Sequence, residues 1–234
     1  MPEQKPAPEP GSESDNEGVI VHPIHHSSLV LQWEQYSIYV DPHDSVQRYN
    51  GMPAPDLILI TDIHGDHLDT LTLRALDLSK GRIIAPPAVI ELLPADLRAL
   101  TDTLRNGEST GKIGIRIDAI PMYNLPEEDG SRHPKGRGNG YVLQMGEQRI
   151  YISGDTEDIP EMRALKGIDV AFVCMNLPYT MDVDQAASAV LEFKPKVVYP
   201  YHYRGQEGFS DIARFEQLVK AGNAAIEVRK GDWY

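Results

Sequence analysis

The stretch from Asp56 to Asp69 has the sequence DLILITDIHGDHLD and decides our prediction of the fold. It begins with a short apolar run, Leu57 to Ile60, which follows the turn-like segment MPAPD and is typical of a buried strand. Directly after this run the chain carries four polar side chains, Asp62, His64, Asp66 and His67. Loops at sheet edges often hold functional side chains, so the stretch indicates a site at the end of a strand.

These four side chains are the ligand types that bind a divalent cation. Imidazole nitrogens and carboxylate oxygens suit zinc, and an open catalytic site leaves one position for water. The alternating order Asp62, His64, Asp66 allows one turn to direct several side chains inward, and His67 can reach a second ion. A polar loop with surface histidines is the alternative, which the density of the cluster disfavours.

The segment TDIHGDHLD resembles the HxHxDH signature of the metallo-β-lactamase-fold hydrolases, with Asp62 at the position usually held by the first His. Three further segments follow in the family's order: VDP at 40–42, SGDT at 153–156 and PYHY at 200–203. Within that superfamily, the chain is most similar to the branch of ascorbate-6-phosphate lactonase-like proteins and N-acyl-phosphatidylethanolamine phospholipase D type enzymes.

The resemblance implies an α/β (α+β) fold, namely an αββα sandwich with its ligands on loops at one sheet edge. The apolar pattern agrees, because strand-like and helix-like segments alternate after Asp69, which is typical of helices packed on a sheet. The predicted strands are 19–22, 28–33, 36–41, 57–60, the short run RIIAPP at 82–87, 113–120, 141–145, 148–153, 169–175, 196–200 and 225–229, and the main predicted helices are 70–78, 87–93, 183–193 and 211–221.

Length and composition predict one folded domain over residues 19–234. The chain of 234 residues is 41% hydrophobic, enough for one sizeable core. Residues 1–18 are rich in Pro, Glu, Ser and Gly and predict a disordered acidic tail. The single cysteine, Cys174, excludes an intrachain disulfide, and its apolar neighbours predict a buried structural thiol.

Charge and hydropathy bear on partners and location. The net charge of −13 opposes binding to nucleic acid, since that affinity comes mainly from Lys and Arg. We find no apolar stretch of the roughly 18 residues that a transmembrane segment needs and no apolar signal core. We expect a cytoplasmic protein, although the N-terminal segment also suits an exported precursor whose signal was removed. The sequence leaves the oligomeric state open.

The resemblance also implies a set of metal ligands. Asp62 and His64 would form the first site with a group from the 124–133 loop, where either Asn124 or His133 replaces the family's usual His. The second site would comprise Asp66, His67 and His202, and Asp155 would bridge the two sites. We expect zinc or manganese, one or two ions per chain. A carboxylate oxygen at position 62 is a harder ligand than an imidazole nitrogen, which shifts the preference of the first site toward manganese.

Further residues are expected around the metals. By resemblance, Asp41 is a structural carboxylate that supports the metal loop. Asp66 is the candidate general base if no metal holds it, and Tyr179 is the candidate hydrogen-bond donor to a developing oxyanion. Lys135 and Arg137 lie in a glycine-containing loop. Because Lys and Arg bind anionic groups, this loop indicates recognition of an anionic group on the substrate. The predicted substrate-binding residues are His26, Asn124, Lys135, Arg137 and Asn176.

The resulting functional prediction is a metal-dependent hydrolase in which metal-activated water attacks a small-molecule anionic ester or lactone. One alternative is a phosphodiesterase acting on a phospholipid or nucleotide. The other is a non-catalytic metal-binding or sensor protein, because Asp62 and Asn124 depart from the family pattern.

Overall fold

The computed structural model describes residues 18–128 and 130–234, so nearly all of the predicted tail lies outside the described residues. The first half of the chain contains β1 (Val19–His25), β2 (Ser28–Trp33), β3 (Tyr36–Val40), η1 (Val46–Tyr49), β4 (Leu57–Leu59), α1 (Thr70–Ala75), β5 (Arg82–Ala85), α2 (Pro87–Leu92), α3 (Ala95–Arg98), β6 (Thr101–Thr103), β7 (Ser109–Lys112) and β8 (Ile115–Met122). The second half contains β9 (Gly138–Met145), β10 (Gln148–Ile152), α4 (Pro160–Arg163), β11 (Val170–Cys174), α5 (Val183–Phe193), β12 (Val197–Tyr201), β13 (Arg204–Gly205), β14 (Gly208–Phe209), α6 (Ile212–Gly222) and β15 (Glu227–Val228).

Two large sheets form the centre of the molecule. The first has the order β1-β2-β3-β4-β5-β6, antiparallel from β1 to β3 and parallel from β3 to β6. The second has the order β15-β12-β11-β10-β9-β8-β7, antiparallel from β7 to β10 and parallel from β10 through β11 and β12 to β15. Each sheet therefore joins an antiparallel meander to a parallel half.

The apolar run of β4 shows why the sheets stack. Leu57 and Leu59 point into the core between the sheets, whereas Ile58 and Ile60 belong to a second core that also contains buried residues of α1 to α3. Successive side chains of a strand face opposite sides. Because both faces of β4 are buried, every position of the run is apolar, as expected for a parallel strand covered on both sides.

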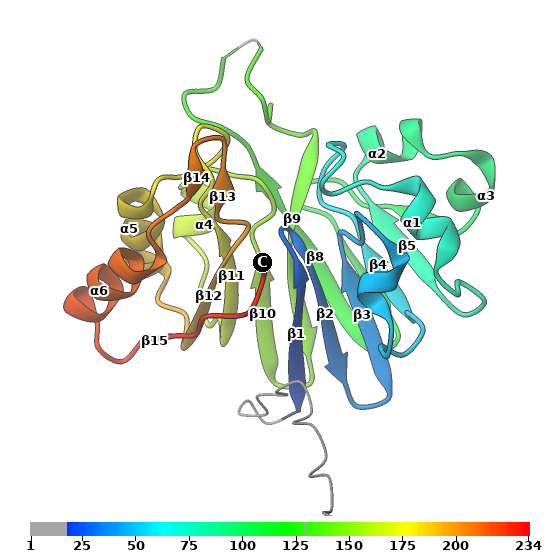
Figure 1. Ribbon diagram of the computed structural model, residues 1–234, viewed down its shortest axis with the longest axis horizontal. Coiled ribbons are helices and arrows are strands. Elements are labelled where there is room, and N and C mark those ends of the chain that lie inside the picture. The colour runs from blue at the N-terminus through cyan, green and yellow to red at the C-terminus, as the bar shows by residue number, and fades with distance from the viewer. Residues whose placement is uncertain (1–17, 129) are drawn as a thin grey trace, which may run out of the picture.

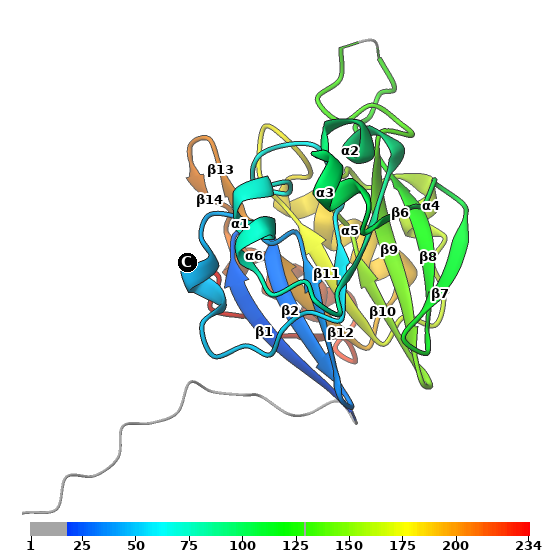
Figure 2. The same ribbon diagram turned by 90° about the vertical axis from the view of Figure 1, so that its right-hand side faces the viewer.

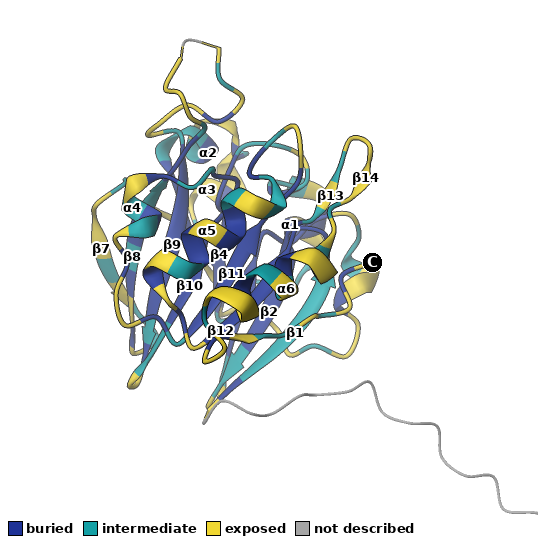
Figure 3. Ribbon diagram, turned by 90° about the vertical axis from the view of Figure 1, so that its left-hand side faces the viewer, coloured by how far each residue is buried: buried dark blue, intermediate teal, exposed yellow. Residues whose placement is uncertain are grey.

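Helices cover the outer face of each sheet, which completes the predicted αββα sandwich. Figure 1 shows α4, α5 and α6 on one side of the strands and α1, α2 and α3 on the other. The view in Figure 2 shows α1 and α3 over the first sheet. In Figure 3 the outward faces of α5 and α6 are exposed while the strands behind them are buried. No described helix is long and apolar enough to cross a membrane.

The predicted elements differ from the structure mainly at their ends. The helix expected over 70–78 ends at Ala75, because Leu76 and Leu78 pack on the core beneath α1 to α3 from an extended segment. The strand expected over 113–120 begins at Ile115, since Ile113 and Gly114 adopt left-handed φ values of 47° and 78° in the turn after β7. The short strands β6, β7, β13 and β14 were not predicted.

Candidate metal centre

The predicted site residues lie on loops that follow the strands near the middle of each sheet. Neighbouring parallel strands end at the same edge, so loops that are distant in sequence meet there. Asp41 follows β3; Asp62, His64, Asp66 and His67 follow β4; Asn124, His133, Lys135 and Arg137 lie between β8 and β9; Asp155 follows β10, Asn176 and Tyr179 follow β11, and His202 follows β12.

Three of these side chains form a buried cluster with the spacing of a metal site. His67 Nε2 and His202 Nε2 lie 3.1 Å apart, and Asp155 Oδ1 lies 3.1 Å from His202 Nε2. Asp155 Oδ2 lies 3.4 Å from His67 Nε2. Zinc bonds of about 2.0–2.1 Å in tetrahedral geometry separate ligand atoms by about 3.3 Å. This cluster therefore fits one divalent cation.

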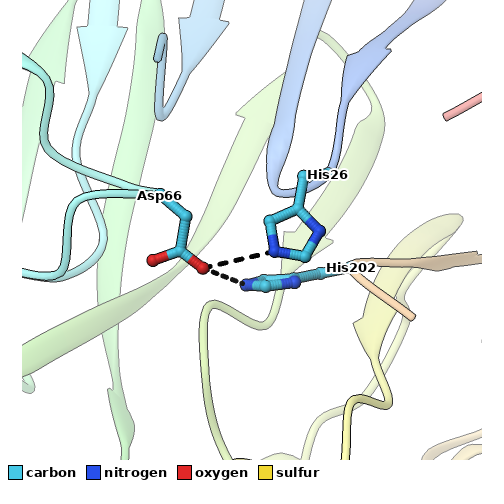
Figure 4. Close-up of side chains that lie close together, drawn as sticks. All are labelled: His26, Asp66 and His202. Atoms are coloured by element: carbon cyan, nitrogen blue, oxygen red, sulfur yellow. Dashed lines mark ion pairs between the residues drawn. The ribbon is translucent and has the colours of Figure 1, made fainter. Parts of the chain in front are cut away.

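Asp66 extends this cluster toward the N-terminal hairpin. Figure 4 shows its carboxylate facing the rings of His26 and His202. Asp66 Oδ2 lies 3.3 Å from His26 Nε2 and 3.5 Å from His202 Nε2. The other ring nitrogen of His26, Nδ1, hydrogen-bonds the Tyr234 hydroxyl at 2.8 Å. His26 and His202 therefore form a second group of two imidazoles and one carboxylate with Asp66.

Asp41 fixes the orientation of His67. Its Oδ2 lies 2.8 Å from His67 Nδ1, and the Thr61 hydroxyl donates to the same oxygen at 2.6 Å. The Thr61 amide donates to Asp41 Oδ1 at 2.7 Å. Both Asp41 and His67 are fully buried. Because Nδ1 of His67 is engaged by Asp41, Nε2 is the nitrogen that faces the cluster.

A third group joins the metal loop to the loop between β8 and β9. Asp62 Oδ2 lies 2.7 Å from His64 Nδ1 and 3.9 Å from His133 Nε2. Arg137 donates to both oxygens of Asp62, through Nε at 3.1 Å and Nη2 at 3.0 Å. The predicted substrate-binding Arg137 is therefore directed onto the carboxylate of the metal loop.

Asn124 folds the β8–β9 loop back toward the cluster. Its Oδ1 accepts a hydrogen bond from the His133 amide at 2.8 Å and lies 3.1 Å from His133 Nδ1. Its Nδ2 donates to the Tyr179 carbonyl at 2.8 Å. This places His133 Nε2 3.3 Å from Asp155 Oδ2. Of the two groups left open for the first site, His133 is the one whose nitrogen reaches the carboxylate of Asp155.

The electrostatics of the buried cluster favour a cation. Burial lowers the pKa of His202 to about 3, although Asp155 opposes this shift, so its imidazole is neutral at pH 7. Burial alone would raise the pKa of Asp155, but His202 and His67 hold it well below its usual range. Burial opposes a charge on His67, yet Asp155, Asp41 and Asp66 raise its pKa. A divalent ion would balance these buried carboxylates.

A cavity of about 260 Å³ opens above the cluster and is lined by His64, Asp66, Arg132, His133, Asp155, Asn176 and Tyr179. Two buried polar atoms at this cavity, His133 Nε2 and Asp155 Oδ1, form no hydrogen bond with a described residue and have only the close ion-pair contacts given above. Buried polar atoms are normally satisfied, so these two indicate that a ligand completes the site. Asn176 Nδ2 lies 3.3 Å from His202 Nδ1 at the wall of the cavity.

Sequence reasoning missed Arg132 at the mouth of this cavity. Its guanidinium lies 4.3 Å from the centre of the Tyr179 ring, and it forms no ion pair with a described residue. Lys135, which was predicted to bind substrate, instead contacts Glu127 and Glu161 at 3.3 and 3.1 Å. The basic character of the 131–137 loop was the available signal, but it did not distinguish free cations from paired ones.

Comparisons with known proteins place the chain in a family. Residues 21–202 match the sequence profile described as beta-lactamase superfamily domain. A UPF0173 metal-dependent hydrolase of Pyrococcus horikoshii is 30% identical over 217 residues, which cover 88% of this chain and 95% of that protein. Another, from Thermococcus onnurineus, is 30% identical over 185 residues, 76% of this chain and 80% of the relative.

Solved structures agree with these matches. A crystal structure from Parabacteroides distasonis, named as a metal-dependent hydrolase, is 39% identical with a TM-score of 0.81, covering 92% of this chain and 94% of that one. Igni18, a metallo hydrolase from Ignicoccus hospitalis, shares the fold at 23% identity and a TM-score of 0.76, over 92% of this chain and 95% of that one. These names identify no substrate, so the expected lactonase-like branch stays a prediction. The profile match over most of the chain shows that this protein belongs to the beta-lactamase superfamily, among the metal-dependent hydrolases.

Proposed function

We propose that this chain hydrolyses a small anionic ester or lactone with the help of zinc or manganese. The observation that carries the proposal is the buried group of His67, His202 and Asp155 beneath an open cavity of about 260 Å³. A cavity of this size suits a small molecule or the end of a larger one. The neighbouring carboxylate of Asp66 completes the ligand set that we assign.

A bound divalent metal lowers the pKa of a coordinated water to about 7 and polarises the carbonyl or phosphoryl group under attack. The chain's own residues hold that metal and orient the substrate. Burial would raise the pKa of Asp66, but His67 and His26 hold it well below its usual range. Since such a carboxylate accepts a proton weakly, we assign Asp66 as a ligand rather than as the general base.

The side chains around the cavity supply recognition of the substrate. Arg132 lies at its mouth, forms no ion pair with a described residue, and can bind a carboxylate or phosphate through two hydrogen bonds. Asn176 and Tyr179 line the wall and can donate to a substrate oxygen. We therefore assign recognition of the anionic group to Arg132, because Lys135 and Arg137 already bind carboxylates of the protein.

The proposal is tested by assaying metal-free and metal-loaded protein on anionic and neutral lactones, p-nitrophenyl esters and phosphodiesters. We expect turnover of an anionic ester or lactone only with metal, and a fall in kcat/KM of more than about a hundredfold for His67→Ala, beyond the usual loss for residues that only support a ligand. His22→Ala is the matched control, because His22 lies on β1 and hydrogen-bonds Gln32.

Other outcomes would change the assignment. Metal-dependent turnover confined to phosphodiesters would support the phosphodiesterase alternative. Binding of metal that depends on His67 without turnover across the panel would support a metal-binding or sensor protein.

A further inference from the structure

Asp62 occupies the position of a metal ligand, but an arginine already neutralises it. The carboxylate is fully buried, and Arg137 donates to both of its oxygens at 3.1 and 3.0 Å. The Arg137 side chain is itself only 18% exposed. A buried, two-pronged contact of this kind is geometrically specific and strong.

The distances around Asp62 differ from those of a coordination sphere. Asp62 Oδ2 lies 2.7 Å from His64 Nδ1, a hydrogen-bond distance, and 3.9 Å from His133 Nε2. Around the other group, the contacts among His67, His202 and Asp155 are 3.1 to 3.4 Å, near the roughly 3.3 Å edges of a tetrahedral site. The spacing among His67, His202 and Asp155 is therefore closer to that of a tetrahedral site than the spacing among Asp62, His64 and His133, whose ligand atoms also lie within reach of one ion.

Charge leads to the same conclusion. Both oxygens of Asp62 accept hydrogen bonds from Arg137, so the guanidinium already balances the buried negative charge that a metal ion would otherwise balance. A divalent ion bound there would lie close to the guanidinium, and the two positive charges would repel each other at low dielectric.

We propose that this chain binds a single metal ion, held by His67, His202 and Asp155 together with Asp66, and that the guanidinium of Arg137 takes the place of the ion expected beside Asp62. The inference rests on the proposed metal-dependent function. His64 and His133 then line the cavity without binding a metal ion. Asp62 contacts Nδ1 of His64 and orients that ring instead of binding metal.

The test is the number of metal ions per chain. Metal-free wild type and variants are equilibrated with excess zinc or manganese, freed of unbound ion and measured by elemental analysis; the manganese spectrum from electron paramagnetic resonance distinguishes isolated from coupled ions. We expect one ion per chain in wild type and two in Arg137→Gln, whose Asp62 is released. Arg137→Lys, which keeps the charge, and Lys135→Gln, which removes a charge from the same loop, should retain one.

A second variant guards against loss of folding in Arg137→Gln. The double substitution Asp62→His with Arg137→Gln removes the unpaired carboxylate and restores the residue usual in the family motif, so it should also bind two ions. Two ions in wild type, or one ion in both folded Arg137 variants that lack the charge, would overturn the inference. Wild type that binds no ion would instead contradict the proposed function.

Discussion

Arg132 is the residue at which substrate recognition is best tested. A hydrogen bond to a charged group contributes about 1.5–3 kcal/mol, a factor of about 10 to 150 in binding. We therefore expect Arg132→Gln to raise KM for an anionic substrate by about tenfold or more, with kcat little changed and KM for a neutral analogue unaffected. Steady-state kinetics on a matched pair of anionic and neutral esters provides the measurement.

Lys135→Gln is the control for Arg132, because both cations belong to the same loop. Lys135 lies over the Tyr123 ring and contacts Glu161, so its removal should leave KM for the anionic substrate nearly unchanged. If both substitutions raised KM for anionic and neutral substrates alike, Arg132 would not be the group that recognises the anion.

Helix α5 follows directly after the loop of Asn176 and Tyr179 and depends on its N-terminal cap. Asp182 accepts a hydrogen bond from the Gln185 amide at 2.7 Å, and Gln185 Oε1 accepts one from the Asp182 amide at 2.9 Å. Loss of such a cap costs about 0.5–2 kcal/mol. We expect Asp182→Ala to lower the melting temperature by about 2–4 °C per kcal/mol lost. Calorimetry that shows no change would contradict this role.

The contact between α1 and α3 should make the stability of the fold depend on pH. Arg74 donates to both oxygens of Asp96 at 2.7 Å and lowers the pKa of Asp96 to about 2. The folded state favours the ionised form of Asp96. The pair's contribution to the free energy of unfolding is therefore present above pH about 4 and is lost as pH falls through about 2. We expect Asp96→Asn to lower the melting temperature at pH 7, and this difference to be roughly halved near pH 3. A difference independent of pH would exclude the assignment.

For the whole molecule, the metal should stabilise the fold. An ion that binds only the folded chain adds about 2.7 kcal/mol at a free concentration one hundred times its Kd. For a protein of this length that corresponds to a rise of about 5–10 °C in melting temperature. We expect a chelator to lower the melting temperature of wild type by this amount. Added metal should raise the melting temperature of His67→Ala only slightly. Thermal unfolding at fixed metal concentration makes the comparison.

The strands and the metal loop were predictable because their signals are local. In β4 every side chain is apolar, and the polar cluster begins within a few residues of its end. Helix ends were less predictable, since Leu76 leaves the helical pattern to pack on the neighbouring core. The two-residue strands β13 and β14 depend on pairing with each other rather than on propensity, and short segments carry little pattern of their own.

The residue pattern alone predicted most strands and helices and a metal site after β4, because apolar periodicity and dense ligand spacing are properties of neighbouring residues. The stacking of two sheets and the full set of candidate ligands came from the resemblance to the metallo-β-lactamase-fold hydrolases. The tertiary structure was needed to show which cations are already paired. Arg137 reaches Asp62 from 75 positions away, Lys135 pairs with Glu161, and Arg132 lies at the cavity without an ion pair to any described residue. Such choices depend on where long loops converge at a sheet edge, and the order of residues along the chain does not encode that convergence locally.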